Sequence, residues 1–351
     1  MSIFHSLFGA GLANSAVLPT LRKLVVRGRP MVLMYHELAR DTVDVDAWAV
    51  LKESDFLRQV DYLRRHYRIV SLDELMNRPR LEDHSRPSVA LTFDDGNVGN
   101  FEVLLPLVKR LELPVAIFIA TGHIESQRLY WFDRIVNALQ VRTPIMLDLR
   151  QYGLGSYRMG QARGASNWNR IQKLLTDIKQ LSTERALEVA SLVEAAVEQS
   201  RDAGYGSILP MTIEQAVTLG KSPFVTIGAH SHGHPLLTQV SIDDARKSIE
   251  KSRELLRAWT GQPIHYFAYP SGAHDDRVVR LIEELGFRAA FTTQERFWNV
   301  GDSPFRIPRM GVGRYDTLDQ FKLNLIGGVR SLGGELRQGF RKQRDAASAY
   351  A

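Results

Sequence analysis

Short apolar runs alternate with amphipathic helical patterns along most of this chain, and this alternation limits its fold more than any other feature. The predicted strands are Met31–Met34, Val89–Phe93, Val115–Ala120, Phe224–Ala229, Tyr266–Tyr269 and Ala289–Thr293. A run that is apolar throughout, such as Val115–Ala120, is typical of a parallel sheet whose two faces are both covered. The sequence therefore predicts a parallel α/β fold.

Local signals mark where several of the predicted helices begin. Thr212 and Gln215 have the spacing of a capping box, in which each side chain satisfies a backbone N–H at the start of the helix. Ser54 is the predicted N-cap of the first helix of the barrel. Pro106 lies inside the helical pattern of residues 101–111 and predicts a kink or a late helix start there.

Residues from about 125 to 210 interrupt the alternation of strands and helices. Their apolar residues recur at helical spacing, so we expect a helical insertion between two strands of the barrel. The barrel itself is expected over residues 30–325. A basic N-terminal segment, residues 1–29, precedes it, and a basic C-terminal tail, residues 326–351, follows it.

Composition limits the chemistry that the chain can carry. It has 351 residues and no cysteine, which excludes a disulfide scaffold, thiolate metal centres and a cysteine nucleophile. Any bound metal must therefore be held by histidine, aspartate or glutamate. The formal net charge of +6 is modest for this length and does not indicate a nucleic-acid partner.

The hydropathy pattern bears on location. No apolar run is long enough to span a bilayer, and the N-terminal residues lack the pattern of a signal peptide. We therefore expect a cytoplasmic protein. Basic residues near both ends leave weak peripheral contact with an anionic membrane surface open. The sequence does not indicate an oligomeric state.

Two polar segments follow predicted strands and carry candidate metal ligands. The segment TFDDG, residues 92–96, places two adjacent carboxylates at the carboxyl end of a strand, where α/β barrels build their sites. The segment HSHGHP, residues 230–235, holds three of the ten histidines of the chain. Its glycine and proline oppose a helix, so we expect a metal site in a loop, with the choice of two histidines left open.

A third segment, FAYPSG over residues 267–272, forms a Pro-x-Gly loop after a predicted strand. Backbone N–H groups of such a loop can face a developing oxyanion. Together the three segments resemble the motifs of the NodB-type polysaccharide deacetylases, carbohydrate esterase family four. The resemblance extends from about Met31 to Arg314 and is interrupted by the insertion.

The resemblance implies a distorted (β/α) barrel of seven or eight strands and a metal-dependent hydrolysis of N-acetyl groups on a glycan. Asp95, His230 and His234 would bind a divalent metal, of which Zn²⁺ suits this donor set best. Asp94 would be the general base. In the third segment, the backbone N–H of Ser271 would bind the oxyanion, and the neighbouring Gly272 would also face the substrate.

The chain departs from the family pattern in ways that point to substitutes. Many members have arginine where Ala268 stands, and the late Leu-x-His segment that supplies the catalytic acid is not visible. His36, after the first strand, is the predicted acid, as in the permuted exopolysaccharide deacetylases. Arg309 is predicted to replace the missing arginine and orient Asp94. Trp298 lies where the family often places a tryptophan that lines the substrate pocket.

Other functions stay open on the sequence. An amidohydrolase-type barrel would use His230 and His232 as a metal-binding pair, but its pair normally follows the first strand. A non-haem iron oxygenase also uses two histidines and a carboxylate, usually on an all-β scaffold. The departures leave a catalytically inactive sugar-binding relative open, and the acyl group removed could be formyl or O-acetyl.

Overall fold

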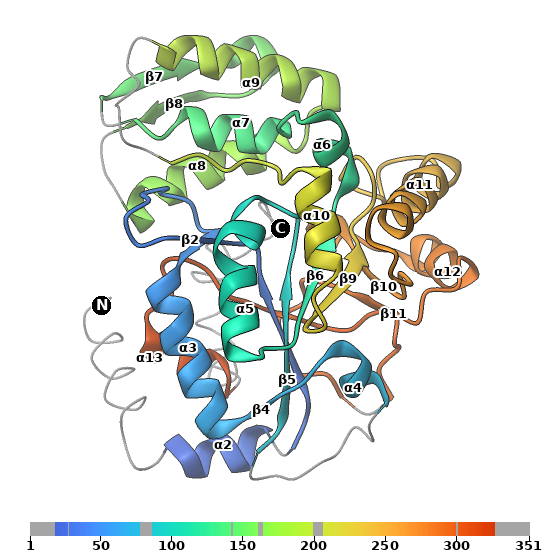
Figure 1. Ribbon diagram of the computed structural model, residues 1–351. Helices are drawn as coiled ribbons and strands as arrows, with labels where there is room; N and C mark the ends of the chain where they lie inside the picture. Colours follow the sequence, from blue (N-terminus) through green and yellow to red (C-terminus); the bar gives the residue numbers. More distant parts are fainter. Residues whose placement is uncertain are drawn as a thin grey trace.

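A sheet of eight parallel strands forms the centre of the protein (Figure 1). In chain order the strands are β1 (Met31–Tyr35), β4 (Arg68–Ile69), β5 (Ser88–Phe93), β6 (Val115–Ile119), β9 (Val225–Ala229), β10 (Tyr266–Ala268), β11 (Ala289–Phe291) and β12 (Met310–Gly311). They lie side by side in the order β11-β10-β9-β6-β5-β1-β12, and β4 also pairs with β5. β11 and β12 stand at opposite ends of this order, and a parallel bridge of Phe291 with Ile307 joins β11 to the segment before β12, which confirms the predicted distorted barrel.

The computed structural model describes residues 18–26, 28–77, 86–141, 143–160, 164–198, 206–299 and 301–326. Most of the predicted N-terminal segment therefore lies outside the described residues, apart from the helix α2 (Leu18–Val26). The predicted C-terminal tail also lies outside them, except for its first residue.

Helices separate the strands, as the apolar spacing predicts. Those around the sheet are α3 (Glu53–His66), α4 (Leu72–Asn77), α5 (Leu105–Leu111), α10 (Ile213–Gly220), α11 (Ile242–Thr260), α12 (Asp276–Glu284) and α13 (Leu318–Asn324). The turn before α5 is a π-helix, Asn100–Leu104, and the α-helix starts at Leu105 with Pro106 in its first turn. The predicted late start at Pro106 is confirmed, because proline is tolerated there and not further along a helix.

One predicted helix start is wrong. α3 begins at Glu53, and Lys52 occupies the N-cap position without a side-chain cap. The Ser54 hydroxyl donates a hydrogen bond to Asp41 Oδ1 at 2.8 Å. The hydroxyl that was predicted to cap the helix is therefore bound by a carboxylate on a neighbouring loop.

The insertion contains more than helices. It holds α6 (Thr121–Ser126), α7 (Trp131–Ala138), α8 (Ala165–Ile178) and α9 (Thr183–Val197), together with an antiparallel hairpin of β7 (Ile145–Asp148) and β8 (Ser156–Met159). The hairpin was not predicted. Apart from α6, whose Ile124 belongs to the core of the barrel, these elements share one apolar cluster with the small sheet of β2 (Glu37–Ala39) and β3 (Val50–Lys52). Figure 1 shows the insertion as a layer at the top of the barrel.

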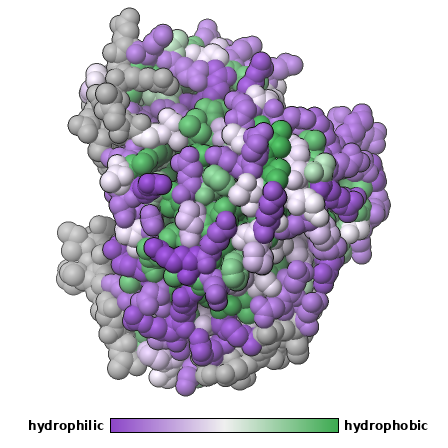
Figure 2. Space-filling view, in the orientation of Figure 1, coloured by the Kyte–Doolittle hydropathy of each residue, from purple (hydrophilic) through white to green (hydrophobic). Residues whose placement is uncertain are grey.

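The surface offers no single large apolar face. Figure 2 shows hydrophilic residues over most of one side of the molecule, with hydrophobic ones between them. Within the described part of the chain, the exposed large hydrophobic residues are scattered: Leu24, Met146, Leu187 and Leu209. Among the helices described, none combines the length and apolar character needed to cross a membrane.

The predicted capping box at the start of α10 is present. Thr212 accepts a hydrogen bond from the Gln215 backbone N–H at 3.2 Å, and Gln215 accepts one from the Thr212 N–H at 2.9 Å. We expect Thr212→Ala to lower the free energy of unfolding by about 1 kcal/mol, because a helix N–H loses its partner. Urea unfolding monitored by circular dichroism measures this loss.

Thr218→Ala is the matched control for this substitution. The Thr218 hydroxyl bonds to the Glu214 carbonyl within the same helix, and this type of bond adds little to helix stability. The Thr218 variant should stay within a few tenths of a kcal/mol of the parent chain, since alanine favours the helix. Equal urea midpoints for Thr212→Ala and the parent chain would contradict the prediction.

Candidate metal centre and catalytic site

Three loops that follow strands of the sheet meet at one edge. Asp94 and Asp95 follow β5, residues 230–234 follow β9, and residues 270–272 follow β10. Because all these strands are parallel, their carboxyl ends lie on the same side of the sheet. Ligands from segments more than 130 positions apart in the sequence are therefore brought together by the order of the strands.

Asp95, His230 and His234 form a candidate metal centre. One ligand atom from each residue lies within 4.8 Å of the other two. Both histidine Nε2 atoms are 3.6 Å from Asp95 Oδ1, and the three side chains are at most 4% exposed. Asp95 Oδ1 and both Nε2 atoms are buried without a hydrogen-bond partner among the described residues. Such buried polar atoms need a partner, and a divalent cation between them would supply it.

The neutral charge of both imidazoles and the tautomer of His230 favour the binding of a cation. His230 Nδ1 lies 2.7 Å from the Ala268 carbonyl oxygen, so Nδ1 donates its proton and Nε2 keeps a lone pair toward the centre. Burial lowers the pKa of His230, partly offset by Asp94. Burial also lowers the pKa of His234, and the neighbouring His230 lowers it further. Both rings are thus neutral near pH 7, the form that binds metals.

Asp95 lies among like charges. Burial raises the pKa of its carboxyl well above the usual range, and the carboxyls of Asp133, Asp94 and Glu37 raise it further. An ionised Asp95 therefore needs a positive charge beside it. The donor set of one carboxylate and two imidazoles suits a divalent metal such as zinc and leaves positions open for substrate.

The loops hold their ligands in an unusual backbone conformation. Of the six non-glycine residues with positive φ in the described chain, Asp95 (72°), Ser231 (63°), His234 (52°) and Ser271 (54°) belong to the three loops. This left-handed region costs most side chains free energy and is frequent at functional sites. The sharp turns aim the side chains inward instead of along the strand.

Arg309 binds Asp94 through both carboxylate oxygens. Its Nη1 and Nη2 donate to Oδ1 and Oδ2 at 2.7 Å each, and both side chains are buried. Burial by itself would raise the pKa of Asp94, but the charges of Arg309 and His230 hold it below its usual value. Asp94 is therefore an ionised carboxylate in a dry site, adjacent in sequence to the ligand Asp95.

Pairing of β12 with β1 brings Arg309 to this position. Met310 pairs with Leu33 of β1, and Ile307 bridges Phe291 of β11, so Arg309 lies where the chain passes between these two strands. Arg309 Nε donates to the Thr292 carbonyl at 3.1 Å, and Nη1 donates to Thr92 Oγ1 at 3.2 Å. The arrangement agrees with the predicted role of Arg309 in orienting Asp94.

His36 also reaches the site from the end of β1. It is 1% exposed, and its charge interacts with those of Asp94, Arg309 and His230. Burial lowers its pKa to about 4, although Asp94 opposes this shift. The ring lies edge-on to Trp48, with 5.5 Å between the centroids. Its place among these residues is the one expected, while its role as the acid stays a prediction.

The third loop is fixed by Gly272. A Cβ at this residue would lie 2.1 Å from Thr293 Oγ1 and 2.8 Å from the Thr293 nitrogen, and φ is +67°. Glycine is therefore required where the loop passes the strand end. The loop places Ser271 near the metal centre, and the oxyanion-binding role of its N–H stays a prediction.

Two further side chains of interest are His232 and Trp298. His232 Nδ1 is 2.9 Å from Thr121 Oγ1, and its Nε2 is 2.9 Å from Lys251 Nζ, so the ring is held away from the metal centre. Trp298 is 3% exposed within an apolar cluster that includes Leu72 and Leu75. The structure thus gives Trp298 a largely buried position, and its role in lining a substrate pocket stays a prediction.

The insertion contributes side chains that were not among the predicted site residues. The rings of Tyr130 and Phe132 lie 5.6 and 5.4 Å from that of His234. Lys179, just after α8, donates to Ser271 Oγ at 2.9 Å. No motif marks these residues, because their position depends on how the insertion packs on the barrel.

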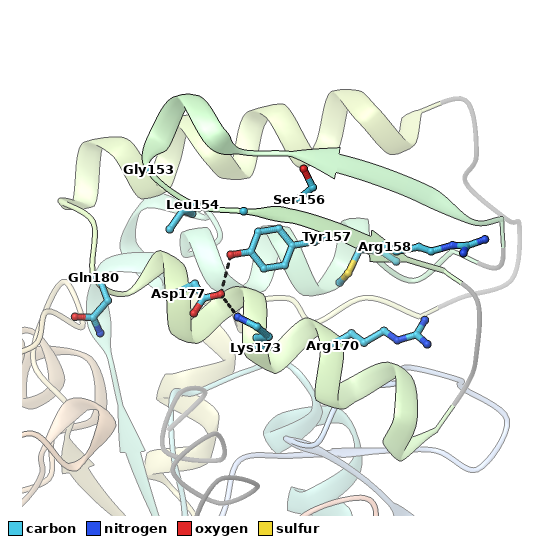
Figure 3. A pocket seen from close by; sticks show the side chains of 11 residues that line it. Gly153, Leu154, Ser156, Tyr157, Arg158, Arg170, Lys173, Asp177 and Gln180 are labelled. Carbon is cyan, nitrogen blue, oxygen red and sulfur yellow. Dashed lines mark hydrogen bonds and ion pairs between the residues drawn. The ribbon is translucent and has the colours of Figure 1, made fainter.

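A separate pocket lies within the insertion, between β8 and α8 (Figure 3). It has a volume of about 740 Å³, and Tyr157, Lys173 and Asp177 are among its lining residues. Asp177 accepts hydrogen bonds from the Tyr157 hydroxyl at 2.7 Å and from Lys173 at 2.6 Å. None of the residues that line it belongs to the three loops.

Comparisons with known proteins relate the chain to polysaccharide deacetylases. A family model described as polysaccharide deacetylase matches residues 82–153 and 195–290. Poly-β-1,6-N-acetyl-D-glucosamine N-deacetylase of Staphylococcus aureus is 27% identical over 86 residues, which are 24% of this chain and 30% of that protein. The matched stretch thus covers less than a third of this relative.

Two solved structures resemble the fold. IcaB from Ammonifex degensii has a TM-score of 0.52 at 17% identity, covering 92% of this chain and 97% of its own. A de-N-acetylase from Aggregatibacter actinomycetemcomitans has a TM-score of 0.53 at 13% identity, covering 84% of this chain and 99% of its own. At these identities the likeness concerns the fold.

The metal centre predicts that the protein binds about one zinc ion per chain. Asp95→Asn should weaken zinc binding at least about 100-fold, because it removes the carboxylate charge between the two imidazoles. At 100 times its Kd, zinc should raise the free energy of unfolding of the parent chain by about 2.7 kcal/mol. Calorimetric titration and zinc-dependent melting measure the two effects.

His232→Ala is the matched control for zinc binding. His232 belongs to the same loop but bonds to Thr121 and Lys251, so its loss should leave zinc affinity within about threefold. Equal zinc affinity for Asp95→Asn and the parent chain would contradict the assignment of ligands.

Proposed function

Because this chain belongs to the polysaccharide deacetylase family, we propose that it is a metal-dependent hydrolase that removes N-acetyl groups from amino-sugar residues of a polysaccharide or a lipid-linked glycan. One observation carries the proposal: the Asp95, His230 and His234 ligand atoms converge within 4.8 Å, next to a carboxylate that Arg309 keeps ionised. The proposed catalytic unit is the barrel of residues 30–325 with its insertion.

Asp94 is the proposed general base. A divalent cation held by Asp95, His230 and His234 would polarise the acyl carbonyl and make a water molecule more acidic. Asp94 then accepts a proton from the attacking water, which its lowered pKa permits over a wide pH range. Arg309 fixes the carboxylate in one orientation through two hydrogen bonds, so the basic oxygens do not swing away.

His36 is proposed to return a proton to the nitrogen that leaves. With a pKa of about 4, its ring is neutral near pH 7 and gains the ability to donate only after it takes up a proton. The attacking water gives up one proton and the departing amine needs one. The proton that Asp94 takes from water passes to the His36 ring, which gives it to the nitrogen, so one proton moves from water to nitrogen and both residues return to their starting charge.

The substrate proposal follows from the curated relatives. These S. aureus proteins act on poly-β-1,6-N-acetyl-D-glucosamine, and we propose a polymer or lipid-linked glycan of N-acetylated amino sugars for this chain. The two departures that suggested an inactive sugar-binding relative have candidate substitutes in Arg309 and His36. An inactive sugar binder would not need a buried carboxylate held by a bidentate arginine.

Acetate release tests the proposed function. The zinc-loaded protein should release acetate from oligomers of β-1,6-linked N-acetylglucosamine, and a chelator should abolish the release. Asp94→Asn should keep zinc but lower kcat by at least about 100-fold, because its amide cannot accept the proton. Enzymatic detection of acetate and measurement of bound zinc give the two values.

The same assay separates the alternatives for the acyl group. O-acetylated and N-formylated glycans, tested in parallel, should be poorer substrates than the N-acetylated one. Full activity in the presence of chelator, or loss of zinc from Asp94→Asn, would overturn the proposed roles of the two aspartates.

Arg309 should determine the pH of the acid-side inflection in the dependence of kcat/KM on pH. Arg309→Lys keeps a positive charge but not the bidentate geometry, so the pKa of Asp94 should rise. The base works only when it is ionised, and therefore the acid-side inflection of kcat/KM against pH should move to higher pH. The same pKa shift affects the stability of the protein. Because the pKa of Asp94 is lowered in the folded state, Asp94 stabilises the fold at pH values above the ordinary carboxyl pKa, and this stabilisation is lost as the pH falls.

Arg306→Lys is the control for this pH profile. Arg306 lies three positions earlier and pairs with Asp276 at the surface, away from Asp94. Its variant should keep the inflection of the parent chain. An Arg309→Lys enzyme that loses rate but keeps the inflection would contradict the role of Arg309.

A further inference from the structure

The insertion sends a cationic side chain into the catalytic site. Lys179 directly follows α8, and its Nζ donates to Ser271 Oγ in the third loop at 2.9 Å. Its charge also interacts with Asp95, and it contributes to the electrostatic environment of His234. One amine thus contacts the loop predicted to bind the oxyanion and interacts electrostatically with residues of the metal centre, although it comes from an element outside the barrel.

Lys179 belongs to the part of the chain that the family model does not match. The two matched stretches end at residue 153 and resume at residue 195, and α8 and most of α9 lie between them. The position of Lys179 is therefore a property of this chain's insertion, in contrast to the loops after β5 and β9.

If Lys179 only attached the insertion to the barrel, an apolar side chain would do so at a lower cost in free energy. Burial lowers the pKa of Lys179 to about 7, because the ammonium loses its contact with water. The charge of Asp95 opposes this shift. An apolar side chain at the same place would attach the insertion more cheaply, as the apolar cluster of α8 and α9 already does.

We propose that Lys179 is a catalytic residue that donates a hydrogen bond to the acyl oxygen of the substrate, beside the backbone N–H of Ser271. An ammonium has three N–H donors and can hold Ser271 Oγ and a substrate oxygen together. It then stabilises the negative charge that develops on this oxygen as water attacks. The inference rests on the proposed function, since it assigns a residue to the same reaction.

Lys179→Met tests this role, because methionine keeps the length and packing of the side chain without its donors. In the zinc-loaded protein, kcat for acetate release from β-1,6-linked N-acetylglucosamine oligomers should fall about 100-fold, the effect of losing one oxyanion donor. KM should change less than about threefold, since the charge arises in the transition state. Lys179→Arg, which restores a cationic donor, should recover part of the rate.

Lys173→Met is the matched control on the same helix. Lys173 pairs with Asp177 on the side of α8 that faces β8 (Figure 3), and its loss should leave kcat unchanged. Zinc content should be equal in all the variants, and Lys179→Met should not lower the melting temperature. A Lys179→Met protein with parental kcat, or one that loses melting temperature while its kcat and KM stay parental, would overturn the inference in favour of a structural contact.

Measuring the binding of acetate tests the proposed contact of Lys179 without requiring turnover. Acetate is the product of the proposed reaction and keeps the acyl oxygen, and the zinc-loaded parent chain should bind it at least tenfold more tightly than Lys179→Met in a calorimetric titration. If the parent chain releases no acetate from any glycan but shows this difference, the proposed function fails and the Lys179 contact stands. A parent chain that binds no acetate, or equal binding by the variant, would overturn the inference.

Discussion

The buried ion pair between Arg309 and Asp94 is the interaction on which the site depends. A carboxylate taken out of water is strongly disfavoured unless its lone pairs find donors, and here two guanidinium nitrogens at 2.7 Å supply them. The pair joins the segment before β12 to the loop after β5, and the Thr292 carbonyl and Thr92 hydroxyl hold the guanidinium from the other sides. One contact therefore orients the proposed base, keeps it ionised and fastens the last strand to the sheet.

The metal centre follows from the topology of a parallel sheet. Adjacent strands end on one edge, so short loops after β5 and β9 bring a carboxylate and two imidazoles together although long stretches of chain separate them. The positive φ values of Asp95 and His234 show how the backbone turns the ligands inward. Such conformations cost about 1–3 kcal/mol each and persist where the surrounding structure holds them, here the hydrogen-bonded ends of the strands.

The insertion is part of the site as well as an addition to the barrel. Its own apolar cluster, shared with β2 and β3, fixes it over the carboxyl end of the sheet. The Tyr130 hydroxyl reaches the His232 carbonyl at 3.1 Å, and Lys179 reaches Ser271. Two contacts from residues at the ends of α7 and α8 thus lie beside the site. The family model does not match the residues of α8.

The sequence by itself predicted the parallel α/β class and six strands of the sheet, because apolar spacing is a local property, while the resemblance to a family pointed to Asp95, His230 and His234 as candidate ligands. Arg309 and His36 could be proposed as substitutes, yet only the pairing of β12 with β1 brings Arg309 to Asp94. The tertiary structure also decided that Trp298 packs in the core and that Lys179 enters the site. These outcomes depend on contacts between segments far apart in the chain, which no spacing of residues encodes.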